Sequence, residues 1–236
     1  MWLQASRSKD KATQWIADHK LLAGGTEAVE GYDALLARDD VDAVYVPLPT
    51  ALHLEWVVKA AEAGKHVLCE KPVALTADDL STMLAACDAA NVQFMDGVMF
   101  MHHARMSKMD TFLRGDPYGD FGEVQRVTSG FSFMGDEDFF KSNIRASSSA
   151  DPLGCLGDLG WYCVRFGLFA FGWDNKPLAV SAKKLKDASV RNKHPLHLRS
   201  THSRYVFAPA WFTNQCVGRL LSCNRRLAQE KECRLT

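Results

Sequence analysis

Residues 41–72, VDAVYVPLPTALHLEWVVKAAEAGKHVLCEKP, contain two strand-like runs on either side of a helix-like run. The first run, 41–47, is rich in β-branched residues and ends at Pro47, and the second is HVLCE, 66–70. The segment 51–64 between them favours a helix that stops at Gly64. Strand, helix and strand at this spacing predict two neighbouring parallel strands covered by a helix.

The same alternation continues on both sides of this stretch. Residues 10–20 favour a helix without Gly or Pro, and residues 92–97 form another strand-like run. Thr76 with Asp79 resembles a capping box at the start of a helix over 77–90. We therefore expect an α/β fold class, with a Rossmann-like parallel sheet over residues 1–97.

After residue 97 the regular alternation of strand-like and helix-like segments stops. Residues 123–133 read as a longer strand, and residues 155–171, CLGDLGWYCVRFGLFAF, as a long apolar helix. We expect a partial α+β domain over 98–185. The tail 186–236 shows no clear period and is predicted to be irregular.

Composition limits the classes of partner and compartment. Among 236 residues, Lys plus Arg and Asp plus Glu both total 28, so net charge gives no basis for binding nucleic acid or anionic membranes. No apolar run approaches the roughly 20 residues that cross a bilayer. The seven cysteines include no Cys-x-x-Cys pair, which indicates reduced thiols and a cytoplasmic location. The adjacent His102 and His103 lack a carboxylate to complete a site, so no metal is predicted.

Lys71 is the first candidate catalytic residue, because it follows the carboxyl end of a predicted parallel strand. Taken alone, Glu70-Lys71-Pro72 is also explained by a strand that simply ends in a turn. However, residues 41–72 resemble the signature of the glucose–fructose oxidoreductase / inositol dehydrogenase / MocA (Gfo/Idh/MocA) family. The resemblance implies a dinucleotide lined by Pro47, Leu48, Pro49 and His53, and a nicotinamide beside Glu70, Lys71 and Pro72, with Lys71 catalytic.

Tyr162 is the second candidate. On a helix it shares a face with Asp158, four residues earlier, and a phenol with a pKa of about 10 can act as an acid–base group beside a cation. Taken alone, Tyr162 also suits a core aromatic position. Family members related to dimeric dihydrodiol dehydrogenase and NADP-dependent xylose dehydrogenase carry a similar Asp-x-Gly-x-Tyr. That resemblance implies an acid–base role for Tyr162 and a substrate contact for Asp158, although many other members have His at the tyrosine position.

Further site residues also rest on the resemblance. Residues 94–109 and 131–162 look like the plant and algal branch of the family, which implies that Arg105 binds substrate and makes Arg145 a weaker candidate. Ser6 and Arg7, in ASRS, match residues that contact the adenosine ribose, with Lys11 a weaker addition. An arginine there suits the 2′-phosphate of NADP, with NAD as the other possibility. A solvated helix start explains Ser6 and Arg7 equally well.

The resemblance implies a hydride transfer between nicotinamide and a sugar, polyol or trans-dihydrodiol carbon, in a family homodimer. No G-x-G-x-x-G precedes Ser6, and the tail does not match the family's remaining strands. We therefore expect an incomplete sheet that lacks its first βα unit, roughly thirty residues, and a chain truncated at both ends. One alternative is a non-catalytic fragment or pseudoenzyme. Another is a redox-neutral glycosidase with tightly held NAD, which Tyr162 in place of His makes less attractive.

Overall fold

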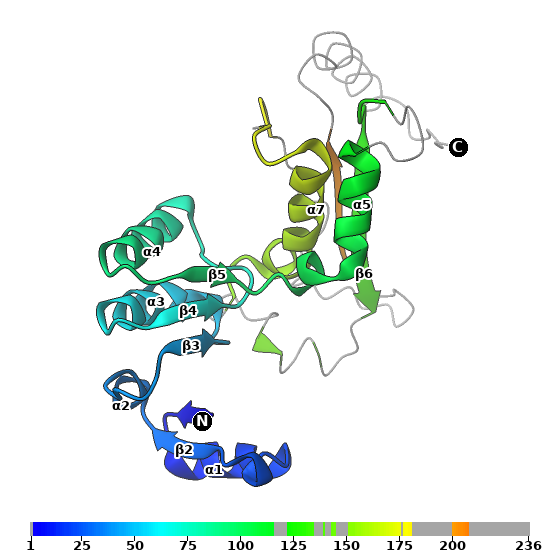
Figure 1. Cartoon of the computed structure of the whole chain (residues 1–236). Coiled ribbons are helices and arrows are strands. Elements are labelled where there is room, and N and C mark those ends of the chain that lie inside the picture. Colours follow the sequence, from blue (N-terminus) through cyan, green and yellow to red (C-terminus); the bar gives the residue numbers. More distant parts are fainter. Residues whose placement is uncertain are drawn as a thin grey trace. The chain divides into compact units, whose positions relative to one another are not determined.

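The computed structural model describes residues 2–115, 122–134, 139, 143–144, 151–175, 177–180 and 200–207. The chain divides into two compact units. Met1–Val98 and Ser147–Leu153 form the first, and Met99–Ala146 and Gly154–Thr236 form the second. In Figure 1 the strands of the first unit run from blue to green, and the helices of the second are green and yellow.

The first unit begins with a small parallel sheet. Strands β1 (Leu3–Ser6) and β2 (Glu27–Glu30) pair in parallel. Helix α1 (Lys9–Asp18) connects them, packs on both strands and buries Ala12 and Ile16. Burial of the Ile16 side chain, which is 1% exposed, contributes about 1.5–3 kcal/mol to stability. A short 3-10 turn (Leu22–Gly24) precedes β2, and helix α2 (Tyr32–Leu36) follows it.

A second parallel sheet contains the stretch 41–72. Strands β3 (Ala43–Val46), β4 (His66–Cys69) and β5 (Phe94–Asp96) lie in the order β3-β4-β5, all parallel. The prediction that residues 41–47 and 66–70 form neighbouring parallel strands is therefore confirmed. The predicted α/β class with a Rossmann-like parallel arrangement is confirmed as well.

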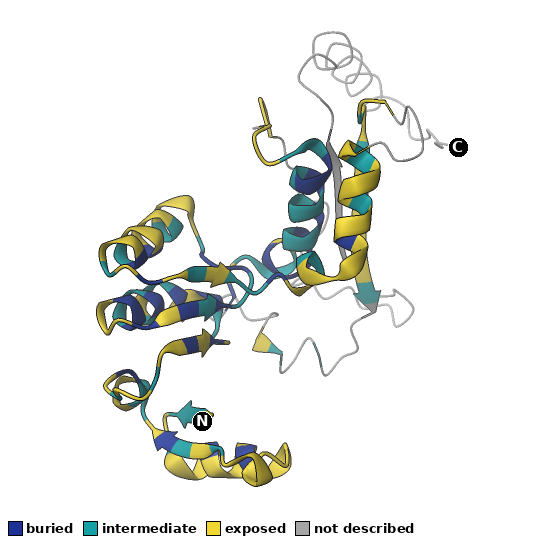
Figure 2. Cartoon of the chain, viewed as in Figure 1, coloured by how far each residue is buried: buried dark blue, intermediate teal, exposed yellow. Residues whose placement is uncertain are grey.

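Two helices complete this part of the core. Helix α3 (His53–Glu62) follows a 3-10 turn, Thr50–Leu52, and packs on β3, β4 and helix α4 (Ala77–Ala89). It ends just before Gly64, whose φ of 72° is the left-handed conformation that glycine adopts without strain. The predicted cap of α4 is confirmed, because the Thr76 hydroxyl accepts a 3.1 Å hydrogen bond from the Asp79 amide. Figure 2 shows buried residues gathered in α3 and β4, while α1 keeps a largely exposed face.

The two parallel sheets share no strand among the described residues. There β1 pairs with β2 alone and β3 with β4 alone, so β1 and β3 each present one unpaired edge. An open edge carries backbone N–H and C=O groups without a ladder partner. The described strands therefore make two partial sheets rather than one continuous one.

The second unit is built on an antiparallel pair. Strands β6 (Val127–Met134) and β7 (Ser200–Phe207) pair over their full lengths, and helix α7 (Trp161–Phe171) packs on both. Helix α5 (Ala104–Arg114) follows the 3-10 turn Met99–His102.

Two expectations for the second unit need revision. The tail 186–236 was predicted to be irregular, yet 200–207 form a strand, because pairing with β6 supplies the order that its own pattern lacks. The predicted helix over 155–171 is present, but residues Leu156–Gly160 form a π-helical turn before α7. A π turn is wider than an α turn, so it shifts Asp158 relative to Tyr162. No helix in the described ranges is long and apolar enough to span a bilayer.

Candidate active site

Two segments leave the second sheet at the same edge, because β3 and β4 are parallel neighbours. Residues 47–49 follow β3, and residues 70–72 follow β4. Ligands of open parallel sheets bind at the carboxyl ends of the strands. The structure thus brings together two of the segments that the resemblance assigns to the dinucleotide. The Lys71–Pro72 peptide bond is cis.

Glu70 connects the two strand ends. Its carboxylate accepts a 2.7 Å hydrogen bond from the Tyr45 phenol and a 3.1 Å hydrogen bond from the backbone N–H of Lys71. The pKa of Tyr45 is raised to about 12, first by burial and then by the hydrogen bond to Glu70. Tyr45 was not identified as a site residue from the sequence. The available signal was an aromatic residue two positions before Pro47.

His53 lies beneath these segments rather than at their surface. The residue is 1% exposed, its Nε2 lies 2.7 Å from the Leu48 carbonyl oxygen and its Nδ1 lies 3.1 Å from the Val73 carbonyl oxygen. Both ring nitrogens therefore face backbone, and a neutral ring can donate to only one of the two carbonyls. The geometry makes His53 a brace between the turn after β3 and the segment after β4.

Gly97 allows the end of β5 to approach Glu70. A Cβ atom at this position would lie 3.2 Å from the Cys69 carbonyl oxygen and 3.2 Å from the Glu70 Cα. The Gly97 amide donates a 2.7 Å hydrogen bond to that carbonyl. Burial raises the pKa of the Cys69 thiol to about 12, with the charge of Glu70 as a second cause, so this thiol stays neutral near pH 7. The sequence indicated Gly97 only as the end of a strand and gave no sign of its close approach to Glu70.

The residues matched to the adenosine ribose lie at the end of β1. Ser6 is its last residue and is half-buried, and Arg7 and Lys11 are exposed. The strand register places Glu30 opposite Ser6, an acidic neighbour that the local sequence did not reveal. No ion pair joins Arg7 to Glu30 in the described structure.

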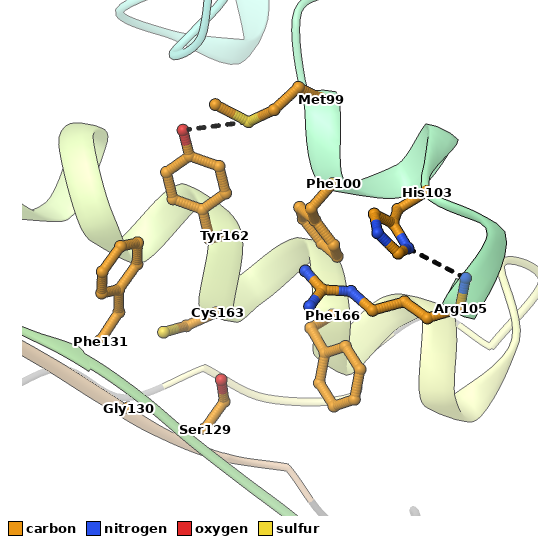
Figure 3. Close-up of a pocket in the computed structure, with 10 residues that line it drawn as sticks. All are labelled: Met99, Phe100, His103, Arg105, Ser129, Gly130, Phe131, Tyr162, Cys163 and Phe166. Atoms are coloured by element: carbon orange, nitrogen blue, oxygen red, sulfur yellow. Dashed lines mark hydrogen bonds between the residues drawn. The ribbon is translucent and has the colours of Figure 1, made fainter. Parts of the chain in front are cut away.

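The second unit contains a cavity of about 530 Å³, shown in Figure 3. It lies among the turn before α5, the start of α5, strand β6 and helix α7. Four of its lining side chains are aromatic. The lining residues are Met99, Phe100, His103, Arg105, Ser129, Gly130, Phe131, Tyr162, Cys163 and Phe166.

In this cavity Tyr162 contacts a methionine sulfur and two aromatic rings. Its hydroxyl donates to the Met99 sulfur over 3.6 Å, and its ring lies 5.9 Å from Phe100 and 5.5 Å from Phe131, measured between centroids. A thioether is a weak acceptor, so a stronger acceptor such as a substrate oxygen would displace it.

Arg105 lines the same cavity as Tyr162, whereas Asp158 does not. Asp158 is 8% exposed and belongs to the π turn before α7. His103, which sequence reasoning weighed only as a metal ligand, caps α5 by accepting a 3.1 Å hydrogen bond from the Arg105 amide. Among the residues the structure describes, no His, Cys, Asp and Glu side chains cluster to hold a metal. Arg145 lies outside the described residues, Lys71 belongs to the first unit, and Tyr162 to the second.

Comparison with known proteins gives one family match. A family model described as an oxidoreductase family with an NAD-binding Rossmann fold, GFO_IDH_MocA, matches residues 7–98.

Individual relatives extend beyond that segment. A dTDP-3,4-didehydro-2,6-dideoxy-alpha-D-glucose 3-reductase from Actinomadura kijaniata is 37% identical over 186 residues, which are 79% of this chain and 52% of that protein. The D-xylose 1-dehydrogenase (NADP(+)) 2 of Haloferax volcanii is 37% identical over 154 residues, 64% of this chain and 45% of that protein. A crystal structure of a 3-ketoreductase from Actinomadura kijaniata, solved with NADP and TDP-benzene, superposes with a TM-score of 0.61 at 35% identity, covering 74% of this chain and 50% of that one. The chain spans about half the length of the curated relatives it matches.

Proposed function

We propose that the protein is an NAD(P)-dependent oxidoreductase of the Gfo/Idh/MocA family, whose NAD-binding model matches residues 7–98. Its reaction moves a hydride between the nicotinamide and a hydroxyl-bearing carbon of a sugar, polyol or trans-dihydrodiol. The observation that carries this proposal is that Tyr162 lines a cavity together with Arg105, with its hydroxyl donating to the Met99 sulfur.

In this proposal Tyr162 exchanges the proton of the reacting hydroxyl. When bound, the nicotinamide supplies or accepts the hydride at C4. Lys71 is the proposed catalytic cation, which orients the substrate hydroxyl. A substrate contact for Asp158 rests on the family resemblance alone, because this residue lies outside the described cavity lining. Glu70 and Tyr45 act on Lys71 through its backbone, by holding the peptide that carries it.

The residues at the strand ends suit a dinucleotide. The half-buried segments 48–49 and 70–71 line the carboxyl edge of parallel strands, which is where such ligands bind. Arg7 offers an exposed cation at the end of β1, and a guanidinium pairs well with a phosphate. We propose that residues 47–49 line the dinucleotide and that Glu70, Lys71 and Pro72 lie beside the nicotinamide. Ser6 and Arg7 hold the adenosine ribose and favour NADP over NAD.

The relatives and the cavity both support the proposed substrate class. The relatives are named as acting on a dTDP-linked keto sugar and on D-xylose, and a cavity of about 530 Å³ lies within the ~300–1,000 Å³ of small-molecule sites. We also propose a place in the plant and algal branch of the family, from residues 94–109. A homodimer and a cytoplasmic location complete the proposal, and light scattering in solution tests the dimer.

A turnover screen tests the proposed function. The protein is incubated with NADP or NAD and a panel of pyranoses, inositols and trans-dihydrodiols, and the reduced nicotinamide is followed by its fluorescence. We expect turnover with at least one member of the panel. If no member is turned over by protein that binds NADPH, a non-catalytic pseudoenzyme is the better account.

A further inference from the structure

Among the described residues that line the second-unit cavity, one side chain carries a full positive charge and none is a carboxylate. Arg105 contributes the guanidinium, and this described lining includes no aspartate or glutamate. The other described lining side chains that can form hydrogen bonds include His103, Ser129, Tyr162 and Cys163, none of which is a carboxylate. A neutral sugar leaves that charge without a counterion.

In the part of the chain that the structure describes, the guanidinium of Arg105 lacks the kind of protein partners that the guanidinium of Arg114 has at the other end of α5. Arg114 pairs with Asp110 and also donates to the Phe169 carbonyl. Within the described ranges, Arg105 forms no ion pair and its guanidinium makes no hydrogen bond. Figure 3 shows its side chain extending from the start of α5 toward the rings of Phe100 and Phe166, into the cavity.

His103 adds a second donor at the same end of the cavity. Its Nδ1 accepts from the Arg105 amide at 3.1 Å, so in the neutral ring the proton resides on Nε2. That N–H is available to an acceptor. An anionic oxygen group would match both donors, since a guanidinium binds carboxylate or phosphate through two parallel hydrogen bonds.

We propose that the substrate of this cavity carries an anionic oxygen group, a carboxylate or a phosphate, which Arg105 binds. The rest of the molecule lies toward Tyr162, with its apolar face against Phe131, which is 41% exposed. This inference rests on the proposed function, because it takes the cavity as the substrate site, but it concerns binding and not hydride transfer.

Calorimetric titration of the whole protein with three matched probes tests the proposal: D-glucose, D-glucuronate and D-glucose 6-phosphate. A charge-assisted hydrogen bond implies that at least one anionic probe binds about tenfold or more tightly than D-glucose. Preference for glucuronate assigns a carboxylate, and preference for the phosphate ester assigns a phosphate. Equal affinity for all three probes, or no binding of any, overturns the proposal.

Two variants assign the effect to Arg105. Arg105→Gln removes the charge and is expected to abolish the preference, while Arg105→Lys keeps part of it. Lys108→Gln removes an exposed cation from the same helix, outside the cavity lining, and is expected to keep the whole preference. A loss as large in Lys108→Gln as in Arg105→Gln would mean that net charge, not this site, attracts the probe.

Binding and turnover separate this inference from the proposed function. Anion-selective binding without any nicotinamide turnover refutes the oxidoreductase assignment and leaves the anion site standing. Turnover of neutral sugars with no anionic preference refutes the anion site alone.

Discussion

The phenol of Tyr45 donates a 2.7 Å hydrogen bond to the carboxylate of Glu70, across the adjacent parallel strands β3 and β4. The second carboxylate oxygen accepts from the backbone N–H of Lys71. A single carboxylate thus connects the end of one strand to the peptide that carries the candidate catalytic lysine.

The first prediction concerns the ionisation of Tyr45. Its pKa is raised to about 12, so the neutral phenol is favoured in the folded protein. The resulting stability is fully present below pH ~10, the ordinary tyrosine pKa, and is lost as pH rises through about 12. Since Tyr45 is 55% exposed, the contact with Glu70 is the cause that a substitution can test.

Glu70→Gln keeps an acceptor but removes the charge, so the pKa of Tyr45 is expected to fall toward its ordinary value. The measurement is the difference in phenolate absorbance between each protein and its Tyr45→Phe counterpart during alkaline titration. Glu55→Gln, which alters an acid paired with Lys59, serves as the control. An unchanged Tyr45 titration in Glu70→Gln would contradict the assignment.

The second prediction concerns the chemistry. Tyr162→Phe removes the proton-exchanging hydroxyl and Lys71→Met removes the cation, so each is expected to lower kcat by about 10²–10⁴-fold. Steady-state assays on the substrate found in the turnover screen measure it. Tyr32→Phe, on a tyrosine that packs against Trp56, is expected to leave kcat unchanged. Near-normal kcat in either site variant removes that residue from the mechanism.

The third prediction concerns the brace formed by His53. His53→Ala leaves the Leu48 and Val73 carbonyls without their contacts and opens a cavity, which we expect to lower the free energy of unfolding by about 2–4 kcal/mol. Urea denaturation measures the change. The exposed His19 stacks on Trp15, and His19→Ala is expected to cost less than about 1 kcal/mol. Equal losses in the two variants would show that the brace adds nothing.

The fourth prediction concerns cofactor choice. Arg7→Ala is expected to weaken NADPH binding by about tenfold to a hundredfold, because it removes a charge-assisted contact with the 2′-phosphate. NADH binding should stay the same. Titration calorimetry with both cofactors measures this, and Lys11→Ala is expected to have the smaller effect. A loss of equal size for NADPH and NADH would assign Arg7 to a part that the two cofactors share.

Much of the first unit could be predicted because its signals are local. A β-branched run ending at Pro47, a glycine at position 64 and Thr76 three residues before Asp79 each act on their own neighbourhood, and the structure has the corresponding strand, helix end and cap. Strand β7 could not be predicted in this way, since its order comes from pairing with β6, from which it is distant in sequence.

For this protein, the sequence alone determined the alternation of strands and helices and the motif that resembles the family signature, because both reside in consecutive residues. Tertiary structure decided how the site residues are used. The buried ring of His53 faces two carbonyls, Tyr45 reaches Glu70 from another strand, and Arg105 shares a cavity with Tyr162. Each of these relationships joins residues separated along the chain, and only the packing of whole elements sets the distance between them.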